Sequence, residues 1–132
     1  ESVAAGGGPF GAVLVMPDGR TFEASNRVTL ENDPTAHAEV MAIRRACREL
    51  GVFELRDATL YASCEPCPMC LGAILQTQLE RVVYGADNLR DGALGGVADL
   101  SGEGWKRVPR VTGGVEAAAA ARLLQAAFAA KR

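Results

Sequence analysis

The chain has 132 residues, with 14 Lys and Arg against 16 Asp and Glu, so its formal net charge is −2. This length fits one domain over 1–132 that can bury a hydrophobic core, and no apolar run approaches the ~20 residues of a membrane span. The acidic balance argues against binding to nucleic acid through bulk charge, and nothing at the start resembles a secretory signal, so we expect a soluble cytoplasmic protein.

The first elements expected in chain order are two strands. The stretch ESVAA at 1–5 is interpreted as the remnant of a helix. GAVLVM at 11–16 is short and apolar, and TFEASN at 21–26 alternates polar and apolar residues. The Pro-Asp-Gly run at 17–19 favours a turn, so the two strands are predicted to form a hairpin. The polar stretch 27–34 ends in Asp-Pro and is expected to be a loop.

A helix is expected over 36–50, with Thr35 as its cap and Gly51 just past its end. His37 and Glu39 then lie in its first turn. Its apolar positions recur every three or four residues, at Val40, Ile43, Cys47 and Leu50.

The second half of the chain alternates strands and helices. The expected elements are strands at 58–63 and 81–86, a helix at 68–76, a strand at 105–112 and a helix at 116–132. Pro68 suits the first turn of its helix, whereas Pro109 cannot donate to a ladder and so places its strand at a sheet edge. The alternation predicts a three-layer α/β domain with a mixed sheet.

One constellation of residues indicates a metal site. His37 is the only histidine, and Cys67 and Cys70 form a C-x-x-C pair at a helix start, where the helix dipole favours thiolates. Zinc takes these ligands, and a catalytic zinc keeps a water beside three of them. Glu39 and Pro66 complete the pattern H-x-E followed by P-C-x-x-C, which is the signature of zinc-dependent nucleobase deaminases.

Glu39 is the candidate for moving protons at this site. With His37 used as a ligand, no second histidine exists for acid and base work, so the task falls to a carboxylate. A zinc-bound water has its pKa lowered towards ~7 and supplies hydroxide at neutral pH. Glu39 would take the water proton and then deliver protons to the ring nitrogen and the leaving amine.

Other interpretations of the cysteines stay open. A structural Cys3His site would add Cys64, and a redox C-x-x-C would leave the H-x-E run unexplained. A third interpretation is ordinary packing in the core, and it fits Cys47, which lies on the apolar face of its helix. The alternative to an enzyme is a non-catalytic zinc-stabilised binding module.

On these motifs the chain resembles the cytidine-deaminase-like superfamily of zinc deaminases. The resemblance implies a three-layer α/β/α sandwich with a five-stranded mixed sheet, a homodimer, and Glu39 as proton shuttle. It implies that Zn²⁺ is held by His37, Cys67 and Cys70. The runs GGPFGAVLV, NDPTAHAEVMAIRRAC and LYASCEPCPMCLGAI are most similar to bacterial guanine deaminases.

The second half follows a different subfamily. RVVYGADNLRDGALGG and VTGGVEAAAAARLLQAAFAAKR are similar to tRNA adenosine deaminases, and residues 96–98 replace an acidic segment expected in guanine deaminases. The substrate expected first is therefore guanine, with adenosine in tRNA as the alternative and cytosine third. RNA binding would need phosphate contacts, which the basic end at Lys131 and Arg132 offers, although such an end also complements a helix dipole.

Six residues are the candidates for contacting a nucleobase or nucleoside. In the guanine deaminases that the chain resembles, the position of Asn26 contacts the base and that of Phe10 lines the pocket. Either residue also has an ordinary interpretation, Phe10 as a core aromatic and Asn26 as a turn residue. The full set is Phe10, Asn26, Ala38, Pro66, Asn88 and Asp99, the last two on a Gly-rich loop over 87–104.

Overall fold

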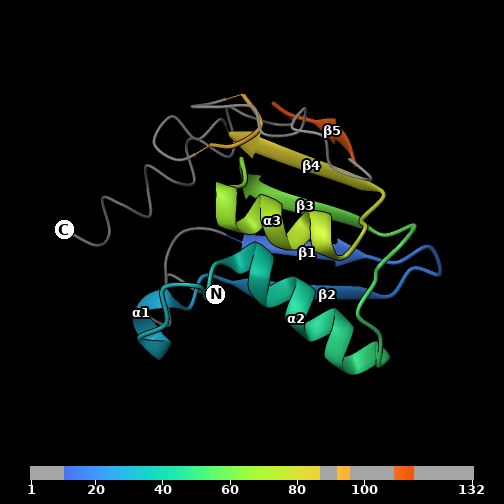
Figure 1. The fold of residues 1–132 in the computed structure, drawn as a ribbon, viewed down its shortest axis with the longest axis horizontal. Coiled ribbons are helices and arrows are strands. Elements are labelled where there is room, and N and C mark those ends of the chain that lie inside the picture. The colour runs from blue at the N-terminus through green and yellow to red at the C-terminus, as the bar shows by residue number, and fades with distance from the viewer. Residues whose placement is uncertain (1–10, 87–91, 96–108, 115–132) are drawn as a thin grey trace.

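The computed structural model describes residues 11–86, 92–95 and 109–114 (Figure 1). The helices expected at 1–5 and 116–132 lie outside these ranges. The elements are β1 (Gly11–Val15), β2 (Thr21–Ser25), α1 (Val28–Glu31), α2 (Ala38–Leu50), β3 (Thr59–Cys64), α3 (Pro68–Gln76), β4 (Arg81–Ala86) and β5 (Arg110–Thr112).

The five strands form one mixed sheet in the order β2-β1-β3-β4-β5. β1 pairs antiparallel with β2 and β3, while β3, β4 and β5 run parallel. The predicted hairpin is confirmed, because Gly19 adopts a left-handed φ of 93° and its N–H donates to the Met16 carbonyl at 2.9 Å. β5 is an edge strand directly after Pro109, which confirms the placement that the proline predicted.

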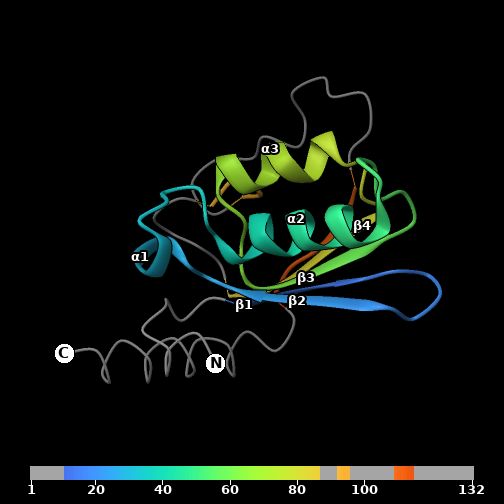
Figure 2. The same ribbon diagram turned by 90° about the horizontal axis from the view of Figure 1, so that it is seen from below.

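Both α2 and α3 lie on the same face of the sheet (Figure 2). The core forms between that face and the helices, where Leu14, Leu60 and Val82 on three neighbouring strands are fully buried. α2 adds Ile43 and α3 adds Ile74 to the same cluster. This packing fixes how the two helix starts lie relative to one another.

The prediction of a loop over 27–34 was wrong in part, because this stretch contains the short helix α1. The Oδ1 atom of Asn26 accepts the Val28 N–H at 3.0 Å, which satisfies a backbone donor at the helix start. Asn32 ends the turn in a left-handed conformation, and its N–H donates to the Val28 carbonyl. An ion pair between Arg27 and Glu31 spans the single turn.

The start of α2 also differs from the prediction. The helix begins two residues later than expected, and its N-cap is His37, in an extended conformation with ψ of 152°, rather than Thr35. The Thr35 backbone N–H and hydroxyl both donate to Asp33 Oδ1, at 2.9 and 2.7 Å, so Thr35 belongs to the preceding turn. The end of the helix is confirmed, with Gly51 in a left-handed conformation.

α3 confirms the prediction at both ends, since it begins at Pro68 and ends at Gln76. Proline is well suited to this position because its missing N–H would have no partner within the helix. No helix within the described ranges is long and apolar enough to cross a lipid bilayer.

Candidate metal centre

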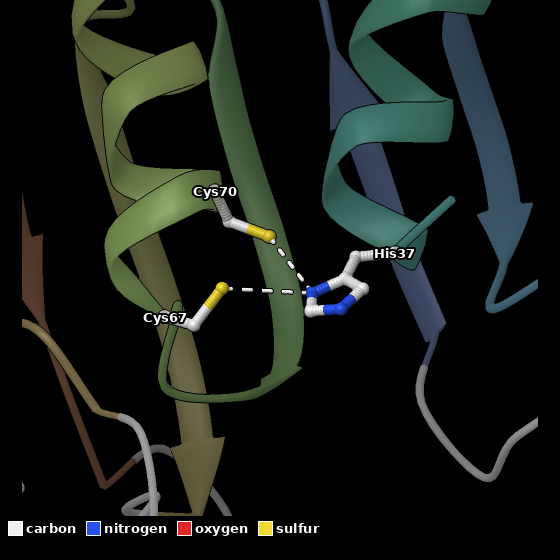
Figure 3. A group of neighbouring side chains, drawn as sticks. All are labelled: His37, Cys67 and Cys70. Atoms are coloured by element: carbon white, nitrogen blue, oxygen red, sulfur yellow. Dashed lines mark hydrogen bonds between the residues drawn. The ribbon is translucent and has the colours of Figure 1, made fainter. Parts of the chain in front are cut away.

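The starts of α2 and α3 bring three potential metal ligands together (Figure 3). His37 is the N-cap of α2, Cys67 is the N-cap of α3, and Cys70 lies in the first turn of α3. The Nδ1 atom of His37 lies 3.5 Å from the Cys67 sulfur and 3.4 Å from the Cys70 sulfur. The three donor atoms all lie within 4.8 Å of one another, so one ion can contact all of them.

This geometry fits zinc. Tetrahedral zinc with bonds of about 2.3 Å to sulfur and about 2.0 Å to nitrogen holds such ligands ~3.5 Å apart, close to the separations seen here. Nδ1 of His37 faces the sulfurs, so a metal ion bound there would leave the ring proton of the neutral imidazole on Nε2. Two thiolates and this imidazole balance the charge of Zn²⁺ and leave a fourth position for water.

The two thiols differ in how readily they ionise. A hydrogen bond from the Cys70 thiol, together with the Cys70 and Met69 backbone amides and the charge on His37, lowers the pKa of Cys67 to about 5. The same hydrogen bond and burial raise the pKa of Cys70. Cys67 is therefore the thiol that loses its proton first, and it supplies the first negative charge to a cation.

Glu39 lies against the ligand group and is buried, with 8% of its surface exposed. Burial, together with the negative charge on Cys67, raises its pKa to about 7. Its own backbone amide, the charge on His37 and a hydrogen bond to Cys70 oppose this rise. Glu39 thus interacts with all three donor residues, and a pKa raised towards neutral suits a group that accepts and returns a proton.

The other two cysteines are not part of this group. Cys64 is the last residue of β3 and lies outside the set of potential ligands that the described residues form. Cys47 packs against the hydrophobic core, and burial raises the pKa of its thiol, in agreement with the core position predicted for it. All four cysteines lie in the described part of the chain and form no disulfide there. These positions argue against a Cys3His site.

The loop that presents His37 is held by residues that the sequence analysis missed. Besides accepting from Thr35, the Asp33 carboxylate pairs with Arg44 of α2 at 3.7 Å. Arg44 also donates to the Thr35 hydroxyl at 3.3 Å. The Arg27 N–H donates to the Ala36 carbonyl at 2.9 Å, directly before His37. The Asp-Pro-Thr spacing could have indicated the turn, since aspartate commonly bonds the backbone two residues on.

Of the three described substrate-binding candidates, two lie next to ligands along the chain. Ala38 and Pro66 are buried and directly adjoin His37 and Cys67. Asn26 is half-buried and its Oδ1 is used in the turn at Val28, as expected of a turn residue. The other candidates, Phe10, Asn88 and Asp99, lie outside the described residues.

Comparison with known families agrees with this geometry. Residues 1–86 match the model of the cytidine and deoxycytidylate deaminase zinc-binding region. The chain belongs to this family. Zn²⁺ is accordingly the cofactor that the family and the His37, Cys67 and Cys70 group both support.

Two similar proteins differ from each other in the function that their names give. Over 121 residues, 91% of this chain, it is 50% identical to a tRNA(Ile)-lysidine synthase from Deinococcus deserti, and it spans 23% of that protein's length. Over 89 residues, 67% of this chain, it is 57% identical to the guanine deaminase of Bacillus subtilis, of which it spans 57%. The chain therefore corresponds to less than two thirds of the length of either protein.

The fold agrees with solved structures as well. A structure from a study of A-to-I editing by tRNA:A34 deaminases at the wobble position of transfer RNA has a TM-score of 0.81 and 42% identity, covering 88% of this chain and 85% of that chain. This agreement confirms the expected α/β fold of the cytidine-deaminase type, with its five-stranded mixed sheet.

Proposed function

We propose that the protein is a zinc-dependent hydrolytic deaminase that releases ammonia from a purine. The observation that carries the proposal is the meeting of three zinc-type donors with a buried carboxylate whose pKa is raised to about 7. In this proposal, His37, Cys67 and Cys70 hold the ion. Glu39 is the residue that moves protons.

The proposed reaction adds water to the amino-bearing ring carbon and breaks its bond to nitrogen. His37, Cys67 and Cys70 would hold the zinc ion, which would supply hydroxide near neutral pH by lowering the pKa of water. Glu39 accepts one proton from the water and passes it to the ring nitrogen, then accepts the second proton from the hydroxyl of the addition product and passes it to the amine, so that the exocyclic C–N bond breaks and ammonia leaves. Burial raises the pKa of Glu39 to about 7, which suits a group that both accepts and donates protons near neutral pH.

Guanine is the substrate that we place first. The support is the 57% identity to a guanine deaminase over 89 residues, 67% of this chain. The overall charge of −2 also suits a small base better than a polyanion.

Adenosine in tRNA is the second candidate. It is favoured by the 42% identity to a tRNA:A34 deaminase structure, because that likeness extends over 88% of this chain. The zinc chemistry is the same for both purines, since each carries an amino group on a ring carbon beside a ring nitrogen. Cytosine is third, and a zinc-stabilised binding module is the non-enzymatic alternative.

A substrate panel tests the proposal. The zinc-loaded protein is incubated with guanine, adenine, cytosine and their nucleosides while ammonia is measured, and with tRNA while inosine is measured. Ammonia from guanine is the expected result. Inosine in tRNA without turnover of guanine would select the second candidate, and inactivity on every compound would overturn the proposal.

The first prediction separates an enzyme from a binding module. Glu39→Gln removes the group that moves protons and should lower kcat by ~10²–10⁴-fold while the zinc content stays the same. Glu49→Gln is the matched control, because Glu49 is an exposed glutamate of the same helix that pairs with Arg45 at 2.7 Å. Full activity in Glu39→Gln would favour the binding module.

Two further expectations stay predictions. A homodimer follows from the family resemblance, and sedimentation of the zinc-loaded protein at several concentrations would test it. A cytoplasmic location would be tested by fractionation of the cells that produce the protein.

A further inference from the structure

Glu65 is a buried carboxylate beside the metal centre that the proposed reaction does not use. It follows Cys64, the last residue of β3, and only 2% of its surface is exposed. Its Oε2 atom accepts the backbone N–H of Leu94 at 2.7 Å. Burying a carboxyl group costs free energy unless hydrogen bonds compensate, so the bond to Leu94 helps to explain how Glu65 is held in this position.

The segment that Glu65 binds, residues 92–95, makes one further contact to the turn before α3 and one to α3 itself. The Ala93 N–H donates to the carbonyl of Pro66 at 2.9 Å. The Ala93 side chain is fully buried and clusters with Leu71 and Leu75 of α3. Two adjacent backbone N–H groups of the 92–95 segment thus bind two adjacent residues of the turn that leads to Cys67.

This attachment lies where the parallel strands end. The Glu65 N–H donates at 2.9 Å to the carbonyl of Ala86, the last residue of β4. β3 and β4 are parallel, with Cys64 paired to Ala86, so the carboxyl ends of both strands lie side by side here. Ligands of open α/β sheets bind beyond the carboxyl ends of the strands, which is where the three zinc-type donors meet.

We infer that Glu65 is a positioning residue that fastens the 92–95 segment to the metal-bearing turn of α3 and thereby sets the affinity for the purine. The inference rests on the proposed function. Glu65 acts here through the Leu94 amide and takes no part in proton transfer. Releasing this bond leaves the ligands in place but allows the segment beside them to move away, so binding weakens while the chemical step is retained.

The test compares two substitutions of similar size. Glu65→Leu removes the acceptor, whereas Glu65→Gln keeps a carbonyl oxygen that can accept from Leu94. We expect Glu65→Leu to raise the KM for guanine, or for tRNA if the panel selects it, on the order of tenfold, with kcat and zinc content unchanged. Glu65→Gln should stay within about twofold of the wild type. Amide hydrogen exchange at Leu94 should accelerate in Glu65→Leu and stay protected in Glu65→Gln.

Two results would overturn the inference: an unchanged KM in Glu65→Leu, or a loss of kcat and zinc content together, which is what a purely structural role predicts. If Glu65→Leu does not fold, Glu65→Asp, which is one methylene shorter, is measured in the same way. A raised KM with a fast Leu94 amide supports the inference, and wild-type values refute it. Inactivity of the wild-type protein would instead refute the proposed function, and Leu94 exchange would still decide whether Glu65 holds the segment.

Discussion

The two halves of the metal centre are built by different kinds of interaction. In the cysteine half, Cys67 is the N-cap of α3 and Cys70 lies in its first turn, and Pro68 between them favours the helix start. In the histidine half, His37 is likewise an extended N-cap, but it is the only ligand that α2 carries. Its loop is held by side-chain contacts, chiefly those of Asp33.

This difference shows where each half is vulnerable. The spacing of the cysteines follows from helical geometry, so few contacts outside α3 are needed to bring the two sulfurs together. The position of His37 depends on a turn, an ion pair at the Asp33 carboxylate and a backbone bond to Arg27. Substitutions away from the ligands should therefore disturb the histidine half more than the cysteine half.

The largest loss of zinc affinity is expected when a ligand is removed from either half of the metal centre. Cys67→Ala and His37→Ala should each weaken zinc binding by ~10²-fold or more, because each leaves two donors where zinc needs three. Competition with a chelator of known affinity measures the loss. The two halves should be equally necessary once the metal joins them.

Cys64→Ser is the matched control for this experiment. Cys64 lies outside the ligand group, so the variant should retain one zinc per chain. Zinc retained by Cys67→Ala but lost in the double variant with Cys64→Ser would show that Cys64 can replace a ligand, and the Cys3His alternative would return.

A second prediction concerns the charge of the cysteine half after zinc is removed by chelation. The pKa of Cys67 is lowered to about 5 from an ordinary 9.0, so its thiolate forms as the pH rises through about 5. Alkylation of Cys67 should reach half its maximal rate near that pH. At pH 6 it should exceed alkylation of Cys47, whose pKa is raised by burial, on the order of tenfold.

The same measurement tests whether the cysteine half is autonomous. Cys70→Ala should shift the half-maximal pH of Cys67 upward, because the Cys70 thiol is the largest cause of the lowered pKa. Asp33→Ala should shift this pH less, because the charge on His37, whose loop Asp33 holds, is a smaller cause of the lowered pKa than the Cys70 thiol. An equal shift in both variants would mean that the two halves are coupled even without the metal, contrary to the comparison.

A third prediction addresses the histidine half. Asp33→Ala removes the acceptor of both Thr35 donors and the partner of Arg44, and should weaken zinc binding on the order of tenfold. Asp33→Asn keeps an oxygen acceptor and should restore most of the affinity. Chelator competition measures both variants, and wild-type affinity in Asp33→Ala would show that α2 alone positions His37.

The sequence predicted the helix of the cysteine half more accurately than the helix of the histidine half. α3 was predicted at both ends because Pro68 restricts its own backbone and marks the start of the helix. The start of α2 was misplaced because Thr35 is a good helix cap by residue type. In the structure, both the backbone N–H and the hydroxyl of Thr35 donate to Asp33, so Thr35 belongs to the preceding turn and does not cap α2.

The chemistry of the centre was more predictable than the contacts that support it. The three donors follow from residue types that zinc requires, whatever the backbone between them, and the role of Glu39 in proton transfer stays a prediction. The burial of Glu65 could not be read from its sequence position, because it depends on the Leu94 amide 29 residues away. Contacts of this kind arise only when the strands and helices pack.

The smallest effect concerns one glycine in each half. Gly51 ends α2 with a φ of 69°, so Gly51→Ala should destabilise the protein by about 1 kcal/mol. Gly72 lies inside α3, where an added Cβ meets nothing within 4 Å, so Gly72→Ala should stabilise it by about 0.5–1 kcal/mol. Urea unfolding measures both changes. Opposite signs would show that Gly72 lowers the stability of α3 through its poor helix propensity, whereas Gly51 is needed for the left-handed residue that ends α2. Destabilisation by Gly72→Ala would mean that other atoms pack against this face of α3.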